Sequence, residues 1–157
     1  MMLGLMQNRP LLISNIVDYV ETWHPKTEIV SRDPQGVIHR SNYGEVVGRA
    51  KRLASALEKL GTKHGDRVAT LAWNSWRHLE LYYGVACSGR VLHTVNPRLF
   101  QEQLTYIMHH AEDSYVFFDL DFAGLVEQLA PHLPLVKGWI ALCDEKETPK
   151  INVPNLM

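Results

Sequence analysis

Residues 65–99 read GDRVATLAWNSWRHLELYYGVACSGRVLHTVNPRL, and they contain two predicted strands with a helix between them. The first strand, 68–73, is almost continuously apolar, which is typical of a parallel strand that is covered on both faces. Ser75 can cap a helix that ends near Gly89, and 91–95 is the second apolar strand. Because parallel strands must be joined by a crossover, usually a helix, this stretch predicts a βαβ unit.

The same alternation continues toward the C-terminus. Apolar residues at helical spacing in 104–111 and 122–129 predict two more helices, while 115–118 and 136–142 read as strands. Consecutive strands are a little over 20 residues apart, which leaves room for one crossover helix each time. The sequence therefore predicts a sheet of repeated βα units.

Three other elements precede this repeat. An amphipathic helix is predicted over 12–23, and strands at 27–31 and 37–40 flank Asp-Pro-Gln-Gly at 33–36, which suits a type I turn. Asn42 with Glu45 resembles a capping box, and the apolar stripe that follows ends at Gly61. These residues predict a helix, a β-hairpin and a long second helix.

The predicted fold class is α/β, with an N-terminal helix and β-hairpin followed by an open, mainly parallel sheet. We divide the chain into a lead-in (1–61), a βα repeat region (65–145) and a terminal loop (146–157). Ligands of such sheets bind beyond the carboxyl ends of the strands. The loops expected at that edge are 74–77, 96–100, 119–121 and 144–147.

Composition restricts the class of protein. The chain has 157 residues, 46% hydrophobic and 21% charged, with a net charge of −1, which is the range of globular proteins. A pI near 6.7 without a basic run argues against nucleic-acid binding. No apolar run approaches the ~18 residues of a membrane span, and residues 1–6 lack the basic start of a signal peptide. Cys87 and Cys143, without a CxxC pair, fit reduced thiols, so we predict a soluble cytoplasmic protein.

Clusters of metal-binding residue types have simpler explanations. His109, His110 and Glu112 form the densest cluster, but adjacent helical residues point about 100° apart, so the two histidines cannot share one ion. Asp119 and Asp121 follow a predicted strand and could hold magnesium or a ribose hydroxyl. An N-cap role is the favoured alternative for them. We predict no metal site.

No complete active site is visible in the sequence. Arg98 could bind a phosphate or carboxylate, and a surface ion pair is an equally good explanation. A phosphate-binding loop needs clustered glycines and usually a nearby lysine, and the chain has no such cluster. A GxSxG motif and paired catalytic carboxylates are also lacking.

Three stretches carry a resemblance to a known family. They are NYGEVVGRAKRLASALEKLG (42–61), the stretch 65–99 quoted above, and YIMHHAEDSYVFFD (106–119). In this order they resemble the N-terminal portion of the AMP-forming acyl-CoA synthetases, or fatty acid–CoA ligases, of the adenylate-forming superfamily, which also contains firefly luciferase. The NPRL loop (96–99) looks most like the medium- and long-chain fatty acid branch.

The resemblance implies a ligase that uses ATP and Mg to convert a fatty acid to an acyl-adenylate and pyrophosphate, after which coenzyme A displaces AMP. In the family the phosphate loop, the adenine and ribose sites and the catalytic lysine lie beyond the position of Met157. The chain is therefore expected to be an incomplete N-terminal domain, inactive alone and without a cofactor of its own. Some fatty acid members pair through this domain, so a homodimer is also expected.

Four residues match family-like motifs: Asn74, His78, Asn96 and Arg98. They are candidates for shaping the acyl or nucleotide region, and none is assigned a catalytic role. Asn74 and Asn96 could equally cap a helix or form Asx-turns. The alternative function is a self-contained α/β binding or dimerisation module without adenylation chemistry.

Overall fold

The computed structural model describes residue 4 and residues 8–157. The expectation that residues 1–6 form no signal peptide concerns positions that lie, except for Gly4, outside the described residues. None of the described helices is long and apolar enough to cross a bilayer.

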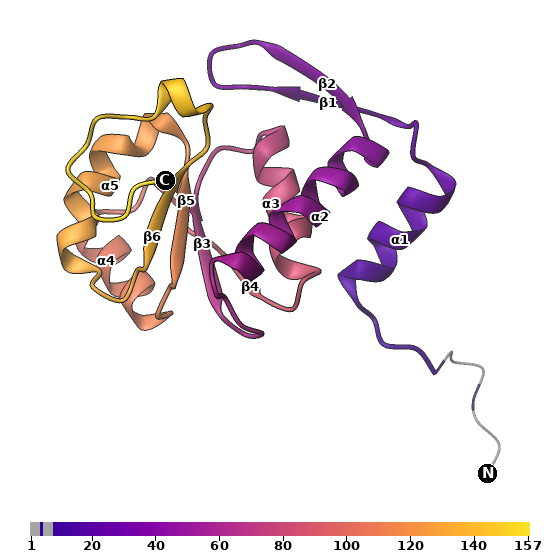
Figure 1. Cartoon of the computed structure of the whole chain (residues 1–157), viewed down its shortest axis with the longest axis horizontal. Coiled ribbons are helices and arrows are strands. Elements are labelled where there is room, and N and C mark those ends of the chain that lie inside the picture. Colours follow the sequence, from indigo (N-terminus) through magenta and orange to yellow (C-terminus); the bar gives the residue numbers. More distant parts are fainter. Residues whose placement is uncertain (1–3, 5–7) are drawn as a thin grey trace.

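A parallel four-stranded sheet forms the centre of the molecule (Figure 1). Its strands are β3 (Arg67–Leu71), β4 (Val91–Thr94), β5 (Tyr115–Phe118) and β6 (Gly138–Ala141), in the order β4-β3-β5-β6. All three pairings are parallel, as the apolar runs predicted. The predicted α/β class and parallel sheet are therefore confirmed.

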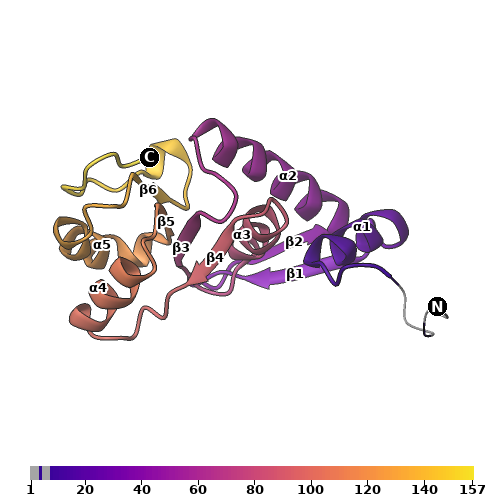
Figure 2. The same ribbon diagram turned by 90° about the horizontal axis from the view of Figure 1, so that it is seen from below.

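Helices cover both faces of this sheet. Figures 1 and 2 show α4 (Gln101–His110) and α5 (Ala123–Leu129) on one side, and α2 (Tyr43–Lys59) and α3 (Trp76–Ala86) on the other. Because side chains alternate along a strand, β3, β5 and β6 contribute to both hydrophobic cores of the sheet. The core under α2 and α3 contains Leu57, Val68, Leu81, Val85, Tyr115 and Phe117. The larger core under α4 and α5 includes Ala69, Leu71, Leu104, Val116, Phe118 and Trp139.

Local sequence signals set the ends of α2. The Asn42 side chain accepts a hydrogen bond from the Glu45 backbone N–H at 3.0 Å, as the capping pattern predicted. At the other end Gly61 adopts a φ of +79°, and the Thr62 N–H donates to the Leu57 carbonyl at 3.1 Å. This is a Schellman ending, which needs the left-handed conformation that glycine adopts at low cost.

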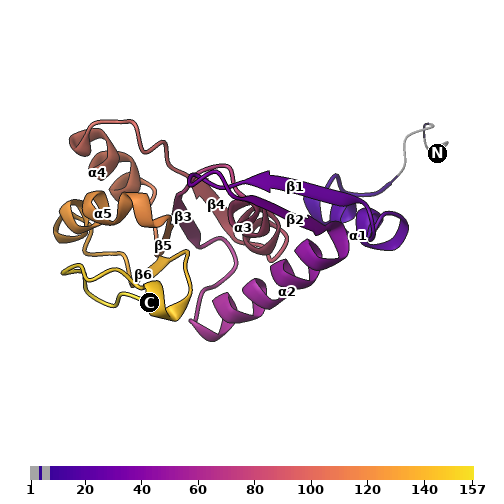
Figure 3. The ribbon, with the colours of Figure 1, turned by 90° about the horizontal axis from the view of Figure 1, so that it is seen from above.

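The hairpin forms around the predicted turn. Strands β1 (Glu28–Arg32) and β2 (Ile38–Asn42) pair antiparallel, and the Gly36 N–H donates to the Asp33 carbonyl at 3.0 Å. Gly36 has a φ of +88°, which suits a type I turn followed by a left-handed residue. In Figures 1 and 3 the hairpin crosses over α3.

The two ends of the chain differ in part from expectation. Helix α1 (Ile13–Trp23) forms as predicted, but Val17 is its one buried residue. The terminal loop is partly ordered against the sheet: the Met157 N–H donates to the Trp139 carbonyl at 2.8 Å, and the Trp139 N–H donates to the Asn155 carbonyl at 3.2 Å. A strand edge has unpaired N–H and C=O groups, and here the last residues satisfy those of β6.

Candidate functional site

The sheet order places a switch point between β3 and β5. The chain leaves β3 through α3 to β4 on one side, and β5 then adds on the opposite side of β3. In open parallel sheets ligands bind in the crevice where the strand order reverses, beyond the carboxyl ends of the strands. The loops after β3 and β5 are therefore the first place to look for a site.

Two aspartates hold Trp73 at this switch point. Asp119 Oδ2 accepts a hydrogen bond from the Trp73 backbone N–H at 2.7 Å, and Asp121 Oδ2 accepts one from the indole Nε1–H at 2.9 Å. The indole also packs against Phe122, with ring centroids 4.9 Å apart. Burial raises the pKa of Asp119, while the Trp73 N–H and nearby Arg77 oppose that rise.

The predicted side-chain N-cap role of Asp119 is wrong. Asp119 occupies the N-cap position of the short 3-10 helix η1 (Leu120–Phe122), but its carboxylate makes no capping hydrogen bond there. The carboxylate instead bonds across the switch point to a backbone N–H that would otherwise lack a partner in the interior. This hydrogen bond could not be predicted from local sequence patterns because its two partners are 46 residues apart.

His78 is buried at the start of α3, and both of its ring nitrogens are occupied. Nδ1 lies 3.1 Å from the Trp73 carbonyl oxygen, and Nε2 lies 3.0 Å from the Thr70 hydroxyl. Because the carbonyl can only accept, the network assigns the proton to Nδ1 and leaves Nε2 to accept from Thr70. Burial lowers the pKa of His78. The geometry thus describes a neutral histidine that fixes the loop after β3.

A cavity of about 550 Å³ lies between β1 and the N-terminal half of α3. Asn74 and His78 both line it, so the structure brings two of the four candidate residues together. Ile29, Leu79 and Tyr82 supply apolar walls. Its volume is within the usual range for small-molecule sites.

Asn96 and Arg98 lie elsewhere, in the loop after β4, and neither lines this cavity. Asn96 Oδ1 accepts a hydrogen bond from the Arg98 backbone N–H at 3.1 Å, which is the Asx-turn that was the alternative role for Asn96. The Arg98 side chain is exposed. A binding role for these two residues stays a prediction.

The histidine-rich end of α4 has a structural explanation. Glu112 forms an ion pair with Arg67 at 2.8 Å, and the His110 ring stacks with Tyr106 at a centroid distance of 5.8 Å. His109 and His110 are exposed. Within residues 4 and 8–157, no three potential metal ligands come together.

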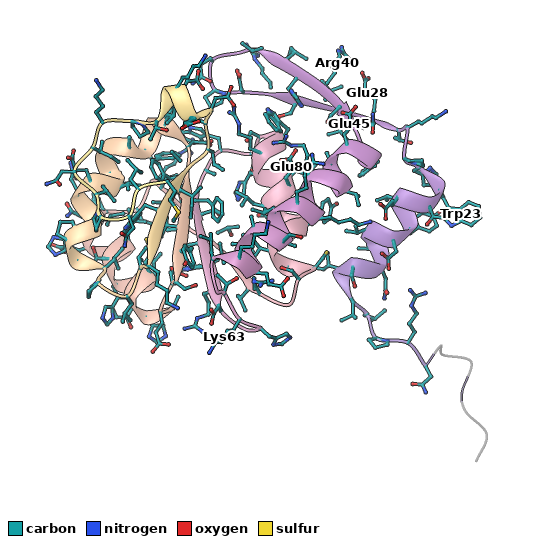
Figure 4. The ribbon with its side chains drawn as sticks, in the orientation of Figure 1. Trp23, Glu28, Arg40, Glu45, Lys63 and Glu80 are labelled. Atoms are coloured by element: carbon teal, nitrogen blue, oxygen red, sulfur yellow. The ribbon has the colours of Figure 1, made fainter. Side chains whose placement is uncertain are left out.

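A cluster around Trp76 links the hairpin to α2 and α3, and no sequence pattern indicated it. His39 stacks on the indole with centroids 4.3 Å apart, and the Arg49 guanidinium lies 5.0 Å from the ring centre. Arg49 Nε also donates to Glu80 at 2.6 Å. Burial raises the pKa of Glu80, and Arg49 opposes that rise (Figure 4 labels Glu80 between α2 and α3).

The two carboxylates at the switch point bind groups of the same chain. Asp119 and Asp121, the carboxylates at the switch point, are both engaged with Trp73. The sequence has no glycine-rich loop with a lysine that could surround a triphosphate. The arrangement at this edge positions loops and packs side chains, and we derive no chemical step from it.

Comparison with known proteins identifies the family. Residues 18–153 match the family described as AMP-binding enzyme. The chain is 46% identical over 155 residues to a 3-methylmercaptopropionyl-CoA ligase from Ruegeria lacuscaerulensis, which covers 99% of this chain and 29% of that relative. It is 42% identical over 156 residues to a medium-chain-fatty-acid–CoA ligase from Ectopseudomonas oleovorans, again with 99% and 29% covered. The chain therefore spans less than a third of the length of these relatives.

A solved structure agrees with these matches. The inhibitor-bound N-terminal domain of FACL13 from Mycobacterium tuberculosis superposes with a TM-score of 0.71 at 26% identity, over 83% of this chain and 33% of that one. The resemblance to acyl-CoA synthetases drawn from the sequence is confirmed. The chain belongs to the AMP-binding enzyme family, and its sheet is that of the N-terminal domain of adenylate-forming CoA ligases.

Proposed function

We propose that this chain is the N-terminal portion of an AMP-forming acyl-CoA synthetase that acts on a medium- or long-chain fatty acid in the cytoplasm. The observation that carries the proposal is the match along 99% of the chain to CoA ligases. One of these relatives is named for a medium-chain fatty acid and the other for 3-methylmercaptopropionate. The complete enzyme would use ATP, Mg and coenzyme A.

Within that enzyme the chain acts as a scaffold. Its sheet and helices are fixed by two hydrophobic cores, and the loops at the carboxyl edge are held by Trp73 and His78. We propose that Asn74 and His78, in the cavity beside β1, shape the acyl or nucleotide region, and that Asn96 and Arg98 support it from the neighbouring loop.

The isolated chain is expected to be inactive. Transfer of a phosphoryl-linked group depends on positioned cations and backbone N–H groups around the phosphates, and the sequence has no loop of that kind. With octanoate, MgATP and labelled pyrophosphate, the 157-residue chain should show background exchange, while the Ectopseudomonas oleovorans ligase serves as the positive control. Robust exchange by the chain alone would contradict the inactivity.

A chimera tests the scaffold role directly. Residues 8–157 would replace the matching segment of the Ectopseudomonas oleovorans ligase, and the chimera should form octanoyl-CoA. A matched chimera that carries Asp119→Ala should lose part of that activity together with stability. A folded chimera without any CoA ligase activity would instead favour the alternative, a binding module of the same fold.

A further inference from the structure

A second cavity lies at the carboxyl ends of β5 and β6, on the face of the sheet that α2 and α3 cover. Its volume is about 350 Å³, at the lower end of the range usual for small-molecule sites. It shares no lining residue with the cavity beside β1. The charged residues of its lining come from the two helices, and they are Arg49, Arg52, Arg77 and Glu80. We call it the arginine cavity.

Most of the remaining lining is apolar. Leu53 and Leu81 come from the helices, Phe117 comes from β5, and Leu142 follows β6. Leu81 and Phe117 are buried in the core, whereas Leu53 and Leu142 are partly exposed. A ligand in the arginine cavity would therefore meet positive charge and apolar surface together.

One ion pair forms within the arginine cavity. Arg49 Nε donates to Glu80 at 2.6 Å, and the Glu80 side chain is almost completely buried. Within residues 4 and 8–157, neither Arg52 nor Arg77 forms an ion pair. Asp119 attracts Arg77 from outside the cavity, so Arg52 is the better test of the site. Three guanidinium groups and one carboxylate leave two positive charges uncompensated in the lining.

Two of the guanidinium groups are held in place by Trp76. The Cζ atoms of Arg49 and Arg77 lie 5.0 Å and 4.8 Å from the centre of its ring. Arg52 extends alongside Gly48, with Nη1 3.9 Å from the position that a Cβ there would take. Because these groups are already positioned, an anion would lose little binding free energy to ordering them.

The charge of the lining indicates the class of ligand. A phosphate monoester carries about −1.5 to −2 at pH 7, whereas a carboxylate carries a single charge. Arg52 and Arg77, which have no ion-pair partner in the described part of the chain, can each bind phosphate oxygens through a planar fork. The apolar part of the lining would accept the organic group that the phosphate esterifies.

We propose that the arginine cavity binds a phosphate monoester with an apolar group, the phosphate on Arg52 and Arg77 and the apolar group against Leu53 and Leu142. The proposal is independent of the ligase function, because it rests on the lining of this cavity alone. Binding requires neither adenylation nor the residues that the longer relatives have in addition.

Titration calorimetry of the 157-residue chain with phenyl phosphate tests the proposal. Binding should saturate at one molecule per chain. Arg52→Gln should weaken it at least about tenfold, because a charge-assisted hydrogen bond is lost. Arg40→Gln on β2 is the matched control: Arg40 removes the same charge but is exposed, pairs with Glu28 and lies outside the cavity, so its affinity should equal that of the wild type.

Amide chemical shifts locate the bound molecule. Phenyl phosphate should move the signals of Leu53 and Leu142 and leave that of Asn74, in the other cavity, unchanged. Arg52→Lys keeps the charge and lacks the fork, so it should bind more weakly than the wild type and retain its circular dichroism.

Four results would overturn the proposal. They are no saturable binding at millimolar phenyl phosphate, wild-type affinity in Arg52→Gln, equal affinity for inorganic phosphate, which has no apolar group, and tighter binding of octanoate. The last result would assign the arginine cavity to carboxylates.

Discussion

At the scale of single residues, both ends of the parallel strands are held by hydrogen bonds that join distant parts of the chain. Asp119 bonds to the Trp73 backbone, and His93 Nδ1 lies 2.8 Å from a carboxylate oxygen of Asp113. The first bond joins the loops that follow β3 and β5, and the second joins strand β4 to the loop that precedes β5. Buried groups of this kind are costly to leave without a partner, so each makes a testable contribution to stability.

Removal of the Asp119 carboxylate should destabilise the protein. Asp119→Ala leaves the Trp73 N–H without its partner in a part-buried position, at an expected cost of about 1–3 kcal/mol in the free energy of unfolding. Asp121→Ala is the matched control, because its bond to the Trp73 indole is exposed and should contribute less than about 1 kcal/mol. Urea unfolding monitored by tryptophan fluorescence measures both. Equal losses in the two variants would contradict the importance of the backbone bond.

Two histidines should make the free energy of unfolding depend on pH in opposite directions. The hydrogen bond to Asp113 raises the pKa of His93 above its ordinary 6.5, whereas burial lowers that of His78 below 6.5. His93 therefore contributes stability that is fully present below pH 6.5 and is lost as the pH rises through its folded pKa. His78 contributes stability that is present above pH 6.5 and is lost as the pH falls through its folded pKa.

Unfolding free energies measured from acid to alkaline pH check this pair of effects. His93→Gln should flatten the alkaline side of the profile, and His78→Gln should flatten the acid side. The exposed His110→Gln variant serves as the control and should leave both sides unchanged. An alkaline slope that survives His93→Gln would show that another group causes it.

At the scale of elements, the close approach of α2 and α3 depends on a glycine. A Cβ at Gly84 would lie 2.7 Å from Leu53 Cδ2 and 2.9 Å from the Ala50 carbonyl oxygen. The second of these is backbone and cannot move without shifting α2. Helix α3 therefore tolerates the low helix propensity of glycine because packing against α2 requires it.

Gly84→Ala should destabilise the protein in spite of the better helix propensity of alanine. Overpacking of this kind costs about 1–3 kcal/mol, which exceeds the roughly 1 kcal/mol gained from propensity. Gly124→Ala in α5 is the matched control: its Cβ would meet nothing within 4 Å, so it should stabilise slightly. Thermal unfolding of the two variants should shift in opposite directions. If Gly84→Ala were as stable as Gly124→Ala, helix α2 would have to shift without cost to accommodate the added methyl group.

At the scale of the whole molecule, the predicted elements assemble into a three-layer arrangement with α1 and the hairpin outside it (Figure 1). The strands and the caps at Asn42 and Ser75 could be predicted from the sequence, because each depends on neighbours within a few residues. The parallel pairing could be predicted from the helix-length connections between the strands. The cavity that Asn74 and His78 line could not be predicted, because four of its ten lining residues come from β1. The role of Asp119 was predicted wrongly because its hydrogen-bond partner, Trp73, lies 46 residues away in the sequence.

The sequence by itself determined the alternation of strands and helices, the positions of the turns, and the family to which the chain belongs. Hydrophobic periodicity and the placement of glycines are local properties, so they can be interpreted without knowledge of the fold. Only the tertiary structure decided the strand order, the bonds of Asp119 and His93, and which face of α1 is buried. These features depend on pairs of residues far apart in the chain, and an apolar stripe shows the same pattern whether its partner lies within the molecule or outside it.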